Sequence, residues 1–191
     1  MVSRFYEREG GLSLVFADGT RASFANALRR SLLNDVGAVG VDSVDIFANS
    51  SIFPCELLAH RVGLVPTLPC AAAGDVFELE ARGPCDVFSD LCVQNGSGGG
   101  GRRPRPCLLP GVLLFTLKKG ERVHMRGRFK RSSGKENARF QRTSGVSAHL
   151  DEHGKRCLSF ESIDASSAVE HLLAAVDALL YKLERVVAAS K

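Results

Sequence analysis

Apolar residues are spaced most regularly in the last part of the chain. Ser167 followed by Glu170 forms a capping box, in which side chains satisfy backbone donors at a helix start, so we predict a helix beginning at Ala168. Beyond it, apolar residues recur at alternating spacings of three and four, as on one face of a helix. This stripe consists of Val169, Leu172, Val176, Leu179, Leu183 and Val186, widened on one flank by Leu173, Leu180 and Val187.

The stripe carries more apolar surface than one small sheet needs to cover. Burying four of its side chains contributes on the order of 10 kcal/mol before ordering costs. Because exposing that surface to water is unfavourable, we favour a partner chain over part of the stripe. The alternative is a helix that packs wholly on its own sheet.

The first part of the chain predicts a hairpin, a helix and a strand. Residues 2–17 alternate around glycines, which predicts two short antiparallel strands. Helical spacing of apolar residues predicts a helix over residues 24–35, with Ser23 as its cap. Alternating β-branched residues predict a strand over residues 38–48, and residues 55–62 can add one or two helical turns.

The middle of the chain changes character. Residues 66–110 are rich in proline and contain a glycine cluster at 97–101, which indicates loops around short strands. Strand-like alternation returns at residues 112–117, 123–129 and 146–150. We therefore predict an α+β protein with a mainly β subdomain inserted into the first domain.

Composition is that of an ordinary globular protein, but charge is unevenly distributed. Of the 191 residues, 45% are hydrophobic and 24% charged, and no apolar run is long enough for a membrane span. The charged N-terminus does not resemble a secretion signal, so we expect a soluble protein that is not secreted. The basic segment, residues 102–142, indicates an acidic neighbour, either protein or nucleic acid; a merely solvated stretch is the alternative.

Motifs for catalysis are missing from the sequence. There is no GxxxxGK[ST], GxSxG or HExxH motif, and the five histidines are not at metal-ligand spacings. Without an export signal the six cysteines are expected to be thiols. Four of them lie in the loop-rich section and could converge on a metal, although the shortest separation, Cys85 to Cys92, is longer than a zinc motif prefers. These four are Cys70, Cys85, Cys92 and Cys107.

Several ordered motifs occur along the chain. They are residues 24–30 (FANALRR), 41–46 (VDSVDI), 48–51 (ANSS), 59–66 (AHRVGLVP), 134–140 (GKENARF) and 161–163 (ESI). Together these segments resemble one protein family, the assembly subunit of multisubunit RNA polymerases. The family comprises the D-like archaeal member, the third-largest subunit of eukaryotic RNA polymerase II and its counterpart in polymerases I and III, and, more distantly, bacterial alpha.

The resemblance implies a fold in two parts. Residues 1–51 and 156–191 would form an alpha-like dimerisation domain, and residues 52–155 an inserted, β-rich domain. The helix over residues 24–35 and the terminal helix would pair with a related subunit. The residues expected at that dimer interface are Phe24, Leu28, Leu32, Leu172, Val176, Leu179 and Leu183.

The resemblance also implies a non-catalytic subunit of a DNA-dependent RNA polymerase. It would pair with a smaller homologous subunit, although a homodimer stays open, and form the platform for the two largest subunits. The chain would be associated with nucleic acid through the assembled polymerase and not by direct contact. An independent basic nucleic-acid-binding module is the alternative function. The residues expected to dock onto the large subunits are Arg29, Arg30, Asn49, His60, Arg61, Lys135 and Glu136.

Two departures from the family matter. The zinc or iron–sulfur loop of many relatives needs closely spaced cysteines, which Cys85 and Cys92 do not reproduce, so we expect no metal or other cofactor. The chain is also shorter than its cellular relatives, which fits a compact version from a large DNA virus or a reduced eukaryote. Its location would be the nucleus, or the cytoplasm or virion for a viral protein.

Overall fold

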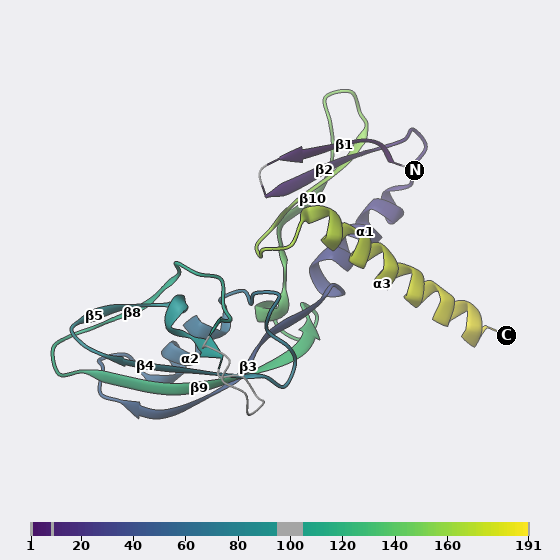
Figure 1. Cartoon of the computed structure of the whole chain (residues 1–191). Coiled ribbons are helices and arrows are strands. Elements are labelled where there is room, and N and C mark those ends of the chain that lie inside the picture. The colour runs from purple at the N-terminus through teal and green to yellow at the C-terminus, as the bar shows by residue number, and fades with distance from the viewer. Residues whose placement is uncertain (1, 9, 95–104, 191) are drawn as a thin grey trace. The chain divides into compact units, whose positions relative to one another are not determined.

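The computed structural model describes residues 2–8, 10–94 and 105–190, and divides into two compact units (Figure 1). Unit 1 combines residues 1–38 with residues 133–191, and unit 2 comprises residues 39–132. The described helices and antiparallel sheets confirm the predicted α+β class. None of these helices combines the length and apolar composition that crossing a membrane requires.

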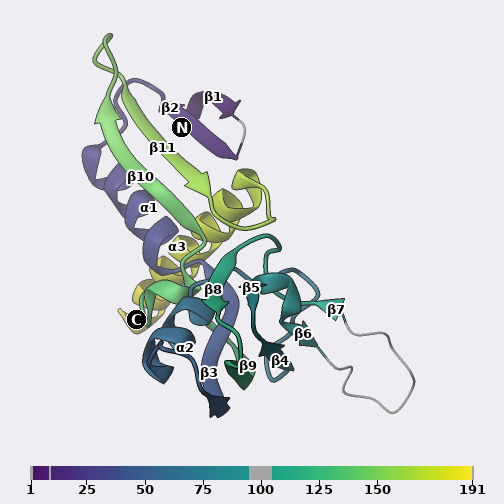
Figure 2. The ribbon, with the colours of Figure 1, turned by 90° about the vertical axis from the view of Figure 1, so that its left-hand side faces the viewer.

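Unit 1 is built on a four-stranded antiparallel sheet. Its strand order, β1-β2-β11-β10, places the predicted N-terminal hairpin beside a second hairpin formed late in the chain. Helices α1 (Ala22–Asn34) and α3 (Ala168–Ala189) pack on each other and on this sheet (Figure 2). The strands are β1 (Val2–Arg8), β2 (Gly11–Phe16), β10 (Thr143–Leu150) and β11 (Arg156–Ser162).

The starts of the two helices differ in how well the sequence predicts them. Helix α3 begins at Ala168 as predicted, and Ser167 Oγ accepts a 3.2 Å hydrogen bond from the Glu170 N–H. Helix α1 begins at Ala22, so the prediction that Ser23 caps it is wrong. Arg21 takes the cap position with extended backbone, and its side chain makes no capping hydrogen bond.

Unit 2 contains a five-stranded sheet in the order β3-β9-β4-β6-β7 and a separate two-stranded sheet of β5 and β8. Alternate residues of the long strands point into one apolar core, which also receives Leu58 and Val62 from α2. The elements are β3 (Gly37–Asn49), α2 (Cys55–Gly63), β4 (Val76–Arg82), β5 (Cys85–Phe88), β6 (Val93–Gln94), β7 (Arg105–Pro106), β8 (Leu113–Leu117) and β9 (Arg122–Ser133), with a single 3₁₀ turn at Ser89–Leu91. A second 3₁₀ turn, at Ala138–Phe140, belongs to unit 1.

The division of the chain differs from the expected ranges of 1–51 with 156–191 and of 52–155. Strand β3 is hydrogen-bonded to β9, so most of it belongs to unit 2. Strand β10 pairs with β11, so residues 133–155 belong to unit 1. The predicted glycine loop at 97–101 and the arginines at 102 and 103 lie outside the described residues.

Candidate protein interface

Helix α3 packs on unit 1 through small and polar residues. Its buried residues are Ala168, His171 and Ala175. At the last of these, Ser31 Oγ of α1 donates a 2.7 Å hydrogen bond to the backbone carbonyl. An alanine at this position leaves room for α1 to approach the helix backbone. The face of α3 that packs on unit 1 is therefore formed by the residues that directly precede those of the predicted leucine stripe.

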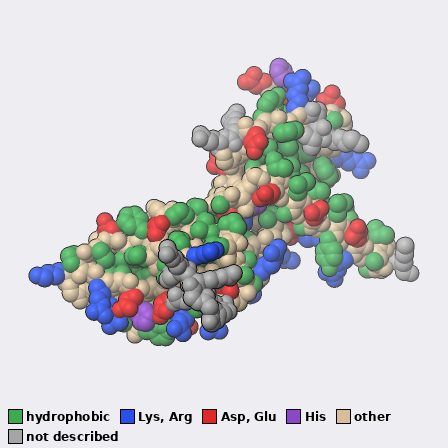
Figure 3. Space-filling model, viewed as in Figure 1, with side chains coloured by type: hydrophobic (Ala, Val, Ile, Leu, Met, Phe, Trp, Pro, Cys, Tyr) green, Lys and Arg blue, Asp and Glu red, His purple; other side chains and the backbone are tan. Residues whose placement is uncertain are grey.

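Beyond Val169, which is 37% exposed, the leucine stripe becomes more exposed toward the end of α3. Leu172 and Val176 pack at the edge of the unit 1 core, whereas Leu183 is 55% exposed and Val186 66% exposed. Hydrophobic side chains are visible along this part of the helix in Figure 3. We call this open region the α3 apolar surface; it comprises Leu173, Leu180, Tyr181, Leu183, Val186 and Val187, each more than half exposed.

The structure separates the residues expected at the dimer interface. Leu28 and Leu32 are 3% and 0% exposed and belong to the core beneath α1, so they are not available on the surface of this chain. Phe24, by contrast, is 47% exposed, with its ring edge-on to Phe16 at 6.0 Å between centroids. Leu179 is partly buried. Sequence periodicity identified the two helices but not which of their leucines face inward.

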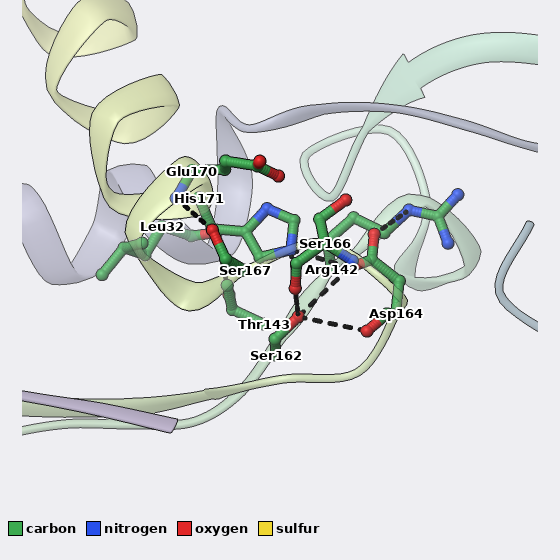
Figure 4. A network of polar contacts seen from close by, with 9 residues as sticks. All are labelled: Leu32, Arg142, Thr143, Ser162, Asp164, Ser166, Ser167, Glu170 and His171. Atoms are coloured by element: carbon green, nitrogen blue, oxygen red, sulfur yellow. Dashed lines mark hydrogen bonds and ion pairs between the residues drawn. The ribbon is translucent and has the colours of Figure 1, made fainter. Parts of the chain in front are cut away.

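A buried polar network lies at the base of α3, and the sequence did not predict it. Figure 4 shows the Asp164 carboxylate in contact with three other side chains. Its Oδ1 atom lies 2.9 Å from His171 Nε2 and 3.1 Å from Ser162 Oγ, and its Oδ2 atom lies 3.6 Å from Arg142 Nε. The Arg142 side chain is only 4% exposed. This arginine belongs to the basic segment of the sequence, yet the structure places it in the interior.

The network is held together by charge and hydrogen bonding. Burial by itself would raise the pKa of Asp164, but hydrogen bonds from His171 and the Ser166 N–H, and the charges of His171 and Arg142, bring that pKa below its ordinary value. Burial lowers the pKa of Arg142, and the charge of Asp164 opposes this change. The ionised Asp164 is thus the stable form in the folded protein.

The serine, histidine and aspartate of this network do not form a catalytic relay. Ser162 Oγ lies 3.1 Å from His171 Nε2, and the Asp164 carboxylate contacts the same ring nitrogen. A serine–histidine–aspartate relay needs the two partners on opposite nitrogens of the imidazole. The geometry therefore supports a structural connection between β11 and the start of α3.

Two of the predicted docking residues line one cavity in unit 1. Arg30 from α1 and Lys135 from the segment between β9 and β10 border a cavity of about 490 Å³, together with Lys182 from α3. The Lys135 N–H donates a 3.0 Å hydrogen bond to the carbonyl of Asn34 at the end of α1. Residues far apart in the sequence thus meet at one concave surface, which we call the basic cavity.

The other docking candidates of unit 1 make mainly local contacts. Arg29 donates from Nε and Nη2 to Asn26 Oδ1, at 3.0 Å each, so its guanidinium is held along its own helix. The Glu136 N–H donates to the Ser133 carbonyl over 3.0 Å and closes a turn. These contacts fix the local backbone and the arginine rotamer.

In unit 2, Asn49 stabilises a loop and Arg61 stabilises a helix contact. The Asn49 side chain donates to the Phe53 carbonyl at 2.8 Å and accepts from Ser51 Oγ at 2.7 Å, which closes the turn after β3. Arg61 Nη2 donates to the Leu113 carbonyl of β8 at 3.1 Å. His60 lies exposed on the same helix.

Comparison with known proteins identifies the family. The chain is 31% identical over 140 residues to DNA-directed RNA polymerase subunit Rpo3 of Methanocaldococcus jannaschii, covering 71% of this chain and 69% of that protein. It is 28% identical over 167 residues to DNA-directed RNA polymerase II subunit RPB3 of Schizosaccharomyces pombe, covering 71% and 55%. The chain belongs to the Rpo3/RPB3 family of RNA polymerase subunits.

The family resemblance expected from the motifs is therefore confirmed. A third relative, subunit 3 of DNA-directed RNA polymerases II, IV and V of Arabidopsis thaliana, is 25% identical over 158 residues, or 66% of this chain and 50% of that protein. This Rpo3/RPB3-family chain spans about half the length of the two eukaryotic relatives. It matches no protein-family model.

Strand β9 of this Rpo3/RPB3-family chain presents basic residues on the outer face of the unit 2 sheet, and acidic residues of β4 pair with several of them. Glu80 lies 3.1 Å from Arg122, and Glu78 lies 3.7 Å from Arg126 and 2.9 Å from His124. A hydrogen bond from Arg82 and the charge of Arg122 lower the pKa of Glu80. The described part of the basic segment is thus partly neutralised within its own sheet.

The cysteines of this family member are thiols in different settings. Burial raises the pKa of the Cys92 thiol, and burial together with the nearby Cys70 raises the pKa of Cys107 to about 12. Cys107 Sγ donates to the Cys92 carbonyl at 3.1 Å, whereas Cys85 Sγ contacts the Arg82 carbonyl. Within residues 2–8, 10–94 and 105–190, no three metal-binding side chains gather at one point.

Proposed function

We propose that this chain is a non-catalytic subunit of a DNA-directed RNA polymerase that heterodimerises with a smaller homologous subunit. The main observation in favour of heterodimerisation is the α3 apolar surface. Six exposed apolar side chains on one helix form a surface that is unfavourable in water and suited to a partner helix. Family membership supports the setting, because the relatives bear the names of RNA polymerase subunits.

Unit 1 supplies the dimerisation surface in this proposal. Phe24 of α1 and Leu183 of α3 are the exposed members of the expected interface, with Leu172, Val176 and Leu179 at its edge. Leu28 and Leu32 support α1 from beneath. Unit 2 takes the role of the inserted domain.

The assembled pair then serves as a platform for the two large catalytic subunits. Arg30 and Lys135 in unit 1, and His60 and Arg61 in unit 2, are the candidates whose exposure suits docking. Arg29, Asn49 and Glu136 act by fixing the local backbone or the helix surface around them.

Purification of the tagged full chain from cells that contain it natively tests this proposal. We expect mass spectrometry to identify a smaller homologous subunit and both large polymerase subunits. The double variant Leu183→Gln/Val186→Gln should lose the smaller subunit, because two buried apolar side chains contribute about 3 kcal/mol or more, equivalent to about a hundredfold in affinity. Glu184→Gln, on the same turn, is the matched control and should retain it.

Two outcomes would contradict the proposal. One is a monomeric wild-type chain without any polymerase subunit in the purified material. The other is binding of the isolated chain to DNA with strong salt dependence and no protein partner, which would favour the independent nucleic-acid-binding module. The ion pairs on β9 and β4 argue against that second result.

A further inference from the structure

The basic cavity of unit 1 combines three cations with one carboxylate. Arg30, Lys135 and Lys182 contribute the positive charges and Asp35 the negative one, a net formal charge of +2. Asp35 is already paired, because its Oδ2 atom contacts Lys182 Nζ. Among the described residues, the side chains of Arg30 and Lys135 make no hydrogen bond or ion pair. Two cations on one concave surface are thus left for an external anion.

Backbone contacts hold the segment that carries Lys135 against α1. The Lys135 N–H is bonded to the Asn34 carbonyl, and Gly134 lies so close to α1 that an added Cβ would be 2.1 Å from the Leu33 carbonyl oxygen. Lys182 is held by Asp35 at the end of the same helix. A site whose backbone is already ordered loses less entropy on binding.

The cavity also has an apolar part. Ala27 of α1 and Leu179 of α3 line it beside the cations. Leu179 belongs to the leucine stripe that leads to the α3 apolar surface, so the cavity continues the surface assigned to a protein partner. A volume of about 490 Å³ holds several side chains and not only a single small ion.

We propose that the basic cavity binds an acidic segment of a protein partner, with a glutamate or aspartate carboxylate between Arg30 and Lys135. The inference rests on the proposed function, because the partner would be another subunit of the assembled polymerase. Arginine binds a carboxylate through two parallel N–H donors, and lysine adds a point charge. The apolar wall accommodates a neighbouring side chain of the same segment.

The lining favours a protein segment over nucleic acid. Single-stranded nucleic acids bind where aromatic rings stack on bases along a basic groove, and none of the described residues that line this cavity is aromatic. A lining without aromatic rings, with Ala27 and Leu179 beside the cations, suits one carboxylate flanked by apolar groups.

Zero-length crosslinking of the native complex with a carbodiimide tests the inference, since the reagent joins a lysine amine directly to a contacting carboxylate. The intrachain link between Asp35 and Lys182 is the internal control for access to the cavity. We expect an additional link from Lys135 to a glutamate or aspartate of another protein chain. Lys135→Arg should abolish that link while preserving assembly.

Charge reversal provides an independent measurement. Lys135→Glu should weaken retention of the crosslinked partner by about tenfold, the effect of losing one charged hydrogen bond. Lys119→Glu, at an exposed turn of unit 2, should leave retention unchanged.

The outcomes separate this inference from the proposed function. Polymerase subunits that co-purify normally, together with the internal control link but no link from Lys135, would overturn the acidic-segment proposal alone. Unchanged partner retention in Lys135→Glu, or crosslinking of Lys135 to nucleic acid under ultraviolet light, would do the same. Purified material without polymerase subunits would instead overturn the proposed function and this inference with it.

Discussion

At the scale of single residues, the interior of unit 1 depends on an ion pair next to a helix start. Arg142 and Asp164 have side chains only 4% and 9% exposed. A charge in such surroundings is tolerated only when it is paired and hydrogen-bonded. The capping residue Ser167 and the network residue His171 belong to the same helix turn, so the network also connects the start of α3 to Asp164.

Replacing Asp164 with asparagine should therefore destabilise unit 1. At pH 7 we expect a loss of about 3–5 kcal/mol, because the variant leaves the Arg142 charge buried without its carboxylate. Chemical denaturation followed by circular dichroism measures the change. Asp177→Asn, on the exposed side of α3, is the matched control and should have little effect.

The same ion pair predicts a pH dependence with a definite sign. The pKa of Asp164 in the folded protein is below the ordinary value of 3.8, so its stabilising effect is fully present above that pH. The effect is lost as the pH falls from about 3.8 through the lower folded-state pKa. The stability difference between wild type and Asp164→Asn should shrink in this range, and a constant difference would contradict the assignment.

At the scale of elements, three close contacts position α1 in unit 1. Its Ser31 hydroxyl bonds to the α3 backbone at Ala175, and its last turn receives the loop at Gly134. A third contact is the 3.0 Å hydrogen bond from Thr143 Oγ1 to the Leu32 carbonyl. All three need short side chains or none at the point of approach, which explains why alanine, glycine, serine and threonine occur there.

Enlarging Ala175 tests which face of α3 is buried. Ala175→Leu should destabilise the chain by about 1–3 kcal/mol, because the site is fully buried and an added side chain must push α1 away. Leu173→Ala, at a position 58% exposed, should change stability far less. Thermal unfolding of the two variants gives the comparison, and the opposite order of effects would mean that the helix is rotated.

A second substitution tests the contact between the loop and α1. In Gly134→Ala the new Cβ would meet the Leu33 carbonyl at 2.1 Å, and backbone atoms must move to relieve it. We expect a loss of about 2–4 kcal/mol. Gly120→Ala is the matched control: its Cβ meets nothing within 4 Å, so only the strain of its positive φ, about 1 kcal/mol, remains. Equal losses in denaturation experiments would argue against a close approach at Gly134.

At the scale of the whole molecule, the chain builds two separate hydrophobic cores. One contains Leu79 and Met125 of unit 2, and the other contains Leu158 and Phe160 of unit 1. Unit 1 is made of two chain segments, so its folding requires the ends of the unit 2 segment to be brought together. The pairing of β3 with β9 satisfies this condition, because the two strands form the entry and the exit of unit 2.

Hydrogen exchange should distinguish these two cores. Leu79→Ala removes a fully buried side chain, should destabilise unit 2 by about 2–5 kcal/mol and should accelerate exchange mainly within residues 39–132. Leu158→Ala should do the same for the described parts of unit 1. Uniform acceleration over both units in either variant would indicate a single cooperative core.

Local sequence was sufficient to predict the α+β class, the opening hairpin, the start of α3 and the family. These features depend on residues a few positions apart, such as Ser167 and Glu170, or on ordered motifs that need no knowledge of contacts. Only the tertiary structure decided that Ala175 is the residue of α3 that meets α1, that Arg142 is buried, and that Arg30 and Lys135 share a cavity. Each of these depends on residues distant in the sequence, whose approach is determined by packing and not by local pattern.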